Sequence, residues 1–223
     1  ARLLAHGHQV AICEQLADPA KTKGIVPRDV VRVITPGLVT DQEQLEASHN
    51  NWLAAIDRHR DGVGIALLDL STGELSAAEV ADLAALLGEL ARSAPREVLV
   101  GCGAIADEGL EPEDEQRRAL EAVRAVAPRA AVREDPALDV DGLAGVLGEL
   151  APEAASLPAF ARRAVARVVR FARACMPGQP LALGRIGRWD PRQALVIDAT
   201  TQAHLELTES VGGGRPGTLL GVI

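Results

Sequence analysis

Residues 51–80 read NWLAAIDRHRDGVGIALLDLSTGELSAAEV, and this stretch predicts three consecutive strands in an antiparallel meander. Asp61-Gly62 and Ser71-Thr72-Gly73 are typical of tight hairpin turns. Short apolar runs separated by such turns favour strands rather than helices. The predicted strands cover residues 52–56, 63–70 and 74–80.

The next residues alternate between helices and strands. Asp82 is placed to cap a helix whose leucines share one face, and Pro95 ends that helix. A buried strand over 97–100, a helix over 112–126 and a strand over 130–133 are expected to follow. The order β-β-β-α-β-α-β, with its first three strands antiparallel, predicts an α/β fold in which helices flank a mixed sheet. This is the ribonuclease-H-like arrangement.

That arrangement raises an alternative function, a metal-dependent nuclease or resolvase. Asp57, Asp69 and Glu74 lie on or beside the first three predicted strands and could converge on two metal ions. The competing interpretation is that hairpin ends are acidic because they are exposed. No acid lies centrally on the first strand, where such chemistry needs one, so this interpretation is preferred.

After Asp139 the pattern becomes helical. Apolar residues at helical spacing over 140–150 precede Pro158, and a longer amphipathic helix is expected after it. Its other face could be a DNA-binding surface, or a solvated arginine face that packs against the acidic remainder of the chain; the solvated face is preferred. That face carries Arg162, Arg163, Arg167, Arg170 and Arg173. A strand over 194–197 and a helix after Asp198 are then expected.

Upstream of the meander, strands are predicted over 10–13 and 27–34, after the end of a helix that Gly7 caps. The segment 21–32 between and within these strands carries four cations and one acid, a local charge of +3. Cations on such a loop can reach backbone phosphates, although a solvated basic loop is the alternative. The four cations are Lys21, Lys23, Arg28 and Arg32.

Composition limits the classes of function. Because the net charge is −8 and the pI is about 5.2, any binding of nucleic acid requires a local basic patch. Cys13 and Cys102 are expected to be small buried hydrophobes in a reducing compartment, and no apolar run is long enough for a membrane span. Both ends of the chain have the pattern of a fragment.

Two glycine-rich segments imitate nucleotide sites. Gly101-Cys102-Gly103 follows a predicted strand, but the preceding strands are linked by hairpins and not by a β-α-β crossover. The segment 212–218, GGGRPGT, has Walker A glycine spacing but Thr218 in place of the required lysine. No catalytic, cofactor-binding or metal-binding residue is predicted in this chain.

Several short sequence motifs carry a resemblance to a known protein family. VAICEQ, DPA-x-x-KG, VVRVITPG and NN-x-LAAI occur in order between Val10 and Ile56, and DATTQAHLELTES follows at 198–210. Together they resemble the MutS family of DNA mismatch-recognition ATPases. Gln202 and His204 depart from the family, which usually has Arg and Asn there. The resemblance divides the chain into the end of the mismatch-binding domain (1–36), a linker (37–50), a ribonuclease-H-like connector domain (51–136) and a helical segment with the start of an all-α core domain (137–223).

The resemblance implies a cytoplasmic homodimer that binds mispaired or looped-out bases in duplex DNA and recruits a MutL-type partner. ATP and Mg²⁺ are expected for the full-length protein, with no site for them in this fragment. The family's Phe-x-Glu wedge has no counterpart, since Phe160 and Phe171 are each followed by Ala-Arg. Lys21, Lys23 and Arg28 are expected to contact DNA phosphates. A protein-interaction adaptor remains a further alternative.

Overall fold

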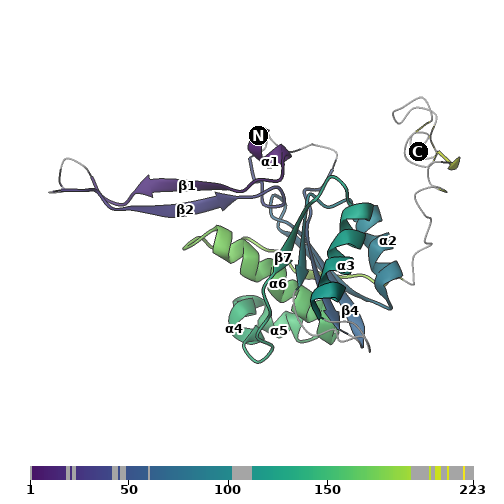
Figure 1. Cartoon of the computed structure of the whole chain (residues 1–223). Coiled ribbons are helices and arrows are strands. Elements are labelled where there is room, and N and C mark those ends of the chain that lie inside the picture. Colours follow the sequence, from purple (N-terminus) through teal and green to yellow (C-terminus); the bar gives the residue numbers. More distant parts are fainter. Residues whose placement is uncertain are drawn as a thin grey trace.

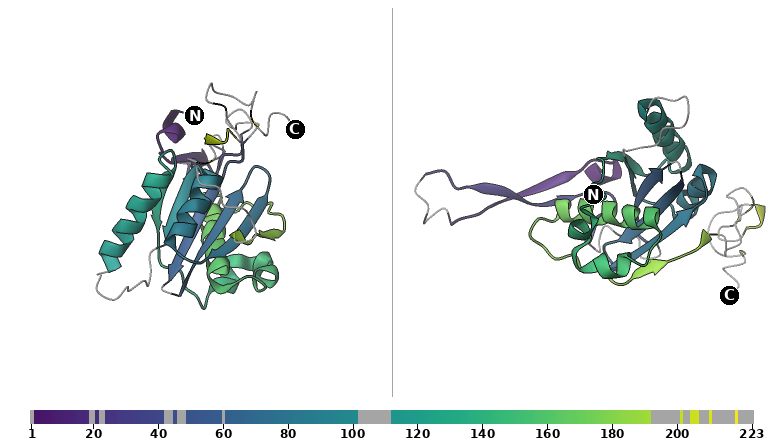
Figure 2. Two further views of the ribbon diagram at one scale, coloured as in Figure 1. Left: turned by 90° about the vertical axis from the view of Figure 1, so that its right-hand side faces the viewer. Right: turned by 90° about the horizontal axis from the view of Figure 1, so that it is seen from below.

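The computed structural model describes residues 2–18, 21, 24–41, 45, 49–59, 61–101, 112–191, 201, 204–206, 210 and 218. Figure 1 shows an α/β body from which a long two-stranded hairpin projects, and the view from below in Figure 2 shows the same projection. Cys102, the strand predicted over 194–197 and most of the segments 198–210 and 212–218 lie outside the described residues. Among the residues that the structure describes, no helix is long and apolar enough to cross a membrane.

The body is built on a six-stranded mixed sheet. Its strand order is β7-β6-β3-β4-β5-β8. β3, β4 and β5 are antiparallel neighbours, whereas β6 is parallel to β3, β7 to β6, and β8 to β5. This agrees with the predicted β-β-β-α-β-α-β order and adds an edge strand, β8, that the sequence pattern did not indicate. The strands are β3 (Leu53–His59), β4 (Gly62–Asp69), β5 (Glu74–Val80), β6 (Glu97–Gly101), β7 (Ala131–Asp135) and β8 (Ile186–Arg188).

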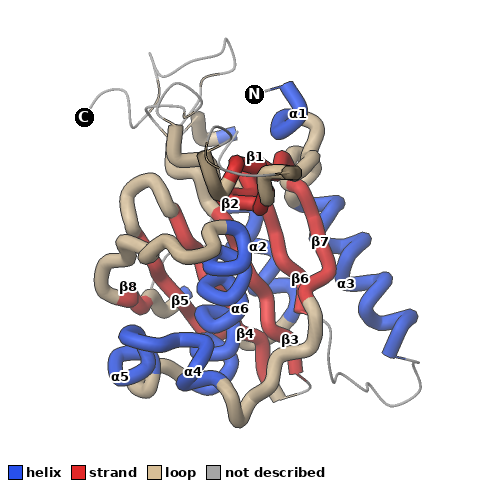
Figure 3. The backbone as a smooth tube through the Cα atoms, turned by 90° about the vertical axis from the view of Figure 1, so that its left-hand side faces the viewer, coloured by secondary structure: helices blue, strands red, loops and turns tan. Residues whose placement is uncertain are grey.

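Helices cover both faces of the sheet, as Figure 3 shows with α6 in front and α2 and α3 behind. Side chains alternate along β3: Leu53 and Ala55 join the core beneath α6, and Ala54 and Ile56 join the core beneath α2 and α3. α2 (Leu83–Ser93) begins at Asp82, whose side chain accepts a hydrogen bond from Ala85 N at 2.8 Å. α3 covers Pro112–Val126, as predicted.

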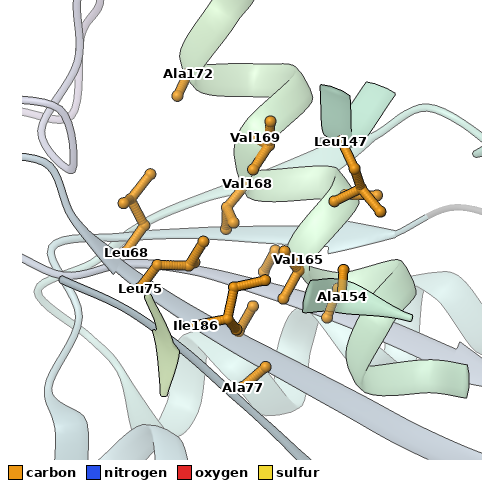
Figure 4. Packing of buried hydrophobic residues seen from close by; sticks show 14 of the residues in the cluster. Leu68, Leu75, Ala77, Leu147, Ala154, Val165, Val168, Val169, Ala172 and Ile186 are labelled. Carbon is orange, nitrogen blue, oxygen red and sulfur yellow. The ribbon is translucent and has the colours of Figure 1, made fainter. Parts of the chain in front are cut away.

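The other face is covered by α6 (Ala159–Cys175), supported by α4 (Leu143–Leu147), η2 (Gly148–Leu150) and α5 (Ala151–Ala154). In Figure 4, Val165 and Val168 of α6 lie on the side of the helix that faces Leu68 and Leu75 of the sheet. A Cβ added at Gly64 of β4 would lie 2.0 Å from the backbone oxygen of Phe160, so this close approach needs a glycine. α6 thus packs on the sheet, although it follows the predicted boundary at residue 136.

The hairpin comprises β1 (Val10–Gln15) and β2 (Arg28–Ile34), preceded by α1 (Arg2–Ala5). Its register runs from Val10 opposite Ile34 to Gln15 opposite Arg28, with an irregularity after Ile12. Cys13 is exposed, so the prediction that it is buried was wrong. The physical reason is that β1 and β2 form a separate two-stranded sheet that projects from the body. No helix or sheet of the described residues packs on the face of the hairpin that carries Cys13, so this side chain stays exposed.

Candidate nucleic-acid interface

The end of the hairpin at which β1 stops and β2 begins projects away from the sheet (Figure 1), and two of the three predicted DNA-binding residues belong to it. Arg28 is the first residue of β2 and is exposed. Lys21 lies in the connection between the strands, with its side chain 85% exposed and its Nζ atom 3.9 Å from Asp18 Oδ2. Lys23 lies outside the described residues. The structure therefore places Lys21 and Arg28 in the same distal part of one hairpin, where both can reach a polyanion.

Arg32, the fourth cation of the basic segment, has a different position. It lies opposite Ile12 in the register, in the half of the hairpin nearer the sheet. Its Nη2 atom donates a hydrogen bond to Thr40 Oγ1 at 2.5 Å, and the residue is half-buried. Arg32 thus links β2 to Thr40, in the segment that follows this strand. Arg32 therefore does not add to the positive charge of the distal part, although it is one of the four cations counted in segment 21–32.

The three acids of the nuclease alternative do not converge. Asp69 and Glu74 are partners in the β4–β5 register, but Asp57 is partnered with Gly64, five residues before Asp69 along β4. At about 3.4 Å per residue, this separates Asp57 from the other two by roughly 17 Å along the strand direction alone. Asp69 accepts hydrogen bonds from Ser71 N and Asn51 N, each at 2.9 Å, and so holds a turn together.

Asp57 is instead enclosed by arginines from α6. Its side chain is completely buried, with Arg167 Nε donating to Oδ2 at 2.8 Å. Arg163 Nε lies 2.9 Å from Oδ1 as an ion pair that lacks hydrogen-bond geometry. β3 extends to His59, so Asp57 lies within the first strand and not at its end, and the preferred interpretation that these acids are exposed was wrong for Asp57 and Asp69, which are buried. Guanidinium groups pair with the Asp57 carboxylate, which has no oxygen facing solvent.

Arg167 also binds a second carboxylate. Its Nη1 atom lies 2.5 Å from Asp135 Oδ2 and donates to Pro136 O at 2.8 Å, while Arg170 Nη2 reaches the same Asp135 oxygen at 2.6 Å. A Cβ added at Gly101 would lie 2.4 Å from Arg167 Cζ, so this glycine leaves room for the guanidinium. Gly101, the first glycine of the imitated dinucleotide motif, thus has a structural role.

These contacts refine the interpretation of the arginine face. Arg163, Arg167 and Arg170 do pair with acidic groups of the chain, as preferred from the sequence, but Arg167 is buried and not solvated, with 2% of its side chain exposed. Arg173 is exposed and donates to the carbonyl oxygens of Val146 and Leu147. Helical periodicity could not reveal the burial of Arg167, because it marks an arginine as a surface residue whatever partners the sheet presents.

The structure thus combines a projecting hairpin that carries exposed cations with an α/β domain whose buried acids Asp57 and Asp135 are paired with arginines. Comparison with protein families identifies both parts: MutS domain I matches residues 1–43, and MutS domain II matches residues 51–137. The chain belongs to the MutS family.

Relatives in this family match along the whole chain. DNA mismatch repair protein MutS from Sorangium cellulosum is 49% identical over 243 residues, covering 100% of this chain and 25% of the relative. The protein of the same name from Myxococcus xanthus is 36% identical over 236 residues, with the same two coverages. The chain therefore spans about a quarter of the length of these relatives.

One similar solved structure is T. thermophilus RuvC in complex with a Holliday junction substrate. It is 20% identical, has a TM-score of 0.40, and covers 56% of this chain and 96% of its own.

Proposed function

We propose that this chain is the part of a DNA mismatch-recognition protein that joins the mismatch-binding domain to the core domain. The observation that carries the proposal is the 49% identity to a DNA mismatch repair protein along the entire chain. The full-length protein would bind mispaired or looped-out bases in duplex DNA and initiate mismatch repair. It would act in the cytoplasm as a homodimer, with a MutL-type partner and with ATP and Mg²⁺ bound outside this chain.

Within that protein, the hairpin would supply backbone contacts to DNA. Lys21 and Arg28 are exposed cations at its distal part, and Lys23 lies between them in the sequence. Long cationic side chains on a projecting hairpin can bind phosphate oxygens from either strand of a duplex. Such contacts would orient the protein on DNA and would carry no base specificity. The recognition of the mispaired base would belong to another part of the protein.

The test is the salt dependence of DNA binding by the full-length protein. Each phosphate contact contributes a slope of about −0.9 to log K against log salt concentration. The double variant Lys23→Glu/Arg28→Glu should bind mismatched duplex more weakly, with a slope shallower by about 2. Arg117→Glu is the matched control, because Arg117 is an exposed arginine of α3 in an i,i+3 pair with Asp114. If the double variant keeps the slope of the unmodified protein, the assignment of these residues is wrong.

A further inference from the structure

Two side chains of the sheet hold the base of the hairpin. Glu97, the first residue of β6, is completely buried, and its Oε2 atom accepts hydrogen bonds from Thr35 Oγ1 and, at 3.0 Å, from Gly37 N. Thr35 follows the last residue of β2. One carboxylate oxygen thus binds the strand of the hairpin that returns to the body.

The other oxygen reaches the strand that leaves the body. Glu97 Oε1 lies 2.5 Å from Arg133 Nε, and Arg133 Nη2 donates a hydrogen bond to Gly7 O at 2.8 Å. Gly7 lies three residues before Val10, the first residue of β1. The two ends of the hairpin, which are separated by β1, the distal connection and β2, are therefore linked through one carboxylate and one guanidinium.

The close approach of the returning strand is built into the backbone. A Cβ added at Gly37 would lie 2.8 Å from the Cβ of Glu97 and 3.0 Å from the Cβ of Leu53. The next residue, Leu38, is 1% exposed and belongs to the core beneath α6. Asn51 Nδ2 also donates to Pro36 O at 3.1 Å. Packing thus fixes the segment that follows β2 to the body. The hydrogen bond from Arg133 to Gly7 O fixes the segment that precedes β1 as well.

A hairpin fixed by one strand can swing about that strand, whereas a hairpin fixed by both moves with the body. We propose that Glu97 and Arg133 are positioning residues that lock the hairpin to the connector sheet, so that the hairpin and sheet reorient together. The effect of this lock on DNA binding rests on the proposed function, because DNA would act on the hairpin through its phosphate contacts. The lock itself is a property of the chain without DNA.

Two variants separate the two contacts. Arg133→Met removes the bond to Gly7 and leaves the carboxylate free to hold Thr35 and Gly37. Glu97→Gln keeps one carbonyl oxygen for Thr35 and Gly37 but turns an amide NH₂ toward the Arg133 Nε–H, which sets donor against donor. Arg117→Met is the matched control, because it removes an exposed arginine from an ion pair that does not contact the hairpin. Arg133→Lys, which keeps the charge with one donor group, replaces Arg133→Met if that variant does not fold.

The geometry is measured by the distance distribution between spin labels on Cys13 and on Glu121→Cys, in a Cys102→Ser background. Cys13 of the hairpin and Glu121 of α3 are both exposed. The unmodified chain and Arg117→Met should give one narrow peak. Arg133→Met and Glu97→Gln should lose that peak and give a broad distribution. A narrow, unshifted peak in folded Arg133→Met, or in folded Arg133→Lys in its place, would overturn the proposal.

Binding of mismatched duplex by the full-length protein is the second readout. Arg133→Met should weaken binding by a factor on the order of ten, within the range of typical coupling energies. The salt slope should stay unchanged, since no phosphate contact is lost. A shallower slope would make Arg133 a DNA contact and would contradict a positioning role. If Lys23→Glu/Arg28→Glu leaves the slope unaltered, the proposed DNA contacts fail, and the label distances still decide whether the lock exists.

Discussion

Arg167 Nε donates a hydrogen bond to Asp57 Oδ2 at 2.8 Å, and neither side chain exposes more than 2% of its surface. The pair joins α6 to β3 through the middle of the domain, and Asp135 of β7 shares the same guanidinium. Burial of charged groups is costly unless each charge keeps its partners. The stability of the domain should therefore depend on Arg167 far more than on arginines at the surface.

Replacement of Arg167 tests this dependence. Arg167→Met should lower the free energy of unfolding by about 3–5 kcal/mol, because it removes the most deeply buried of the cations paired with Asp57 and Asp135 and leaves only Arg163 and Arg170 beside these carboxylates. Arg117→Met, at an exposed pair, should change it by less than about 1 kcal/mol. Urea unfolding followed by circular dichroism measures both. Equal effects of the two substitutions would show that the buried pair is not a major source of stability.

The separation of Asp57 from Asp69 and Glu74 makes a prediction about catalysis. Incubation of the chain with Mg²⁺ and duplex or branched DNA should give no cleavage, because the three carboxylates cannot share metal ions and Asp57 is paired with arginines. Gel electrophoresis of end-labelled DNA provides the measurement. Cleavage that disappears in Asp69→Ala would restore the nuclease alternative, whereas cleavage that persists in Asp69→Ala would indicate a contaminating nuclease.

Two glycines should respond in opposite directions to substitution by alanine. Gly64→Ala places a Cβ 2.0 Å from a backbone atom of α6 and should cost at least about 1–3 kcal/mol through overpacking. Gly88 lies within α2, where an added Cβ meets nothing within 4 Å, so Gly88→Ala should stabilise the chain by up to about 1 kcal/mol. Thermal unfolding of both variants checks the signs. A neutral Gly64→Ala would mean that α6 can move away from the sheet.

The cysteines should differ in reactivity. Burial, and next the nearby charge of Glu97, raises the pKa of Cys175 from 9.0 to about 11. Because the thiolate is the nucleophile, iodoacetamide at pH 8 should modify exposed Cys13 and leave Cys175 unmodified until urea unfolds the chain. Mass spectrometry of peptides from a Cys102→Ser chain measures this. Equal rates at both cysteines in the folded chain would contradict the buried position of Cys175.

The same pKa predicts a pH dependence of stability. The folded chain holds the Cys175 proton more tightly than the unfolded chain does, so this contribution is complete below pH 9 and is lost as the pH rises to about 11. Unfolding midpoints should fall over that interval, and the fall should be smaller in Cys175→Ala. If Cys175→Ala shows an undiminished fall, other groups cause it.

The elements of the domain could be predicted because their signals are local. β5 and α3 have the predicted bounds, since turn residues and apolar periodicity mark both. β8 has three residues, one of them Gly187, which is too short for any periodic signal. Its position depends on pairing with β5, more than 100 residues earlier in the chain.

The contacts that distinguish this domain are not local. Arg167 meets Asp57 across 110 residues, and Thr35 meets Glu97 across 62. No spacing in the sequence connects such pairs, so the burial of Arg167 and the fastening of the hairpin could be found only in the folded chain. The DNA contacts of Lys21, Lys23 and Arg28 stay a prediction, because an exposed cation has the same appearance whether or not it binds phosphate.

The late position of β8 has a consequence for synthesis of the protein. On the ribosome, β5 is complete at residue 80, but the strand that pairs with its outer edge ends at residue 188. Throughout that interval the backbone of Leu75–Ala77 lacks its final partner, and an open strand edge is a template for pairing with other chains. Nascent or truncated chains that stop before Ile186 should therefore aggregate through β5, and chains that extend beyond Arg188 should be protected.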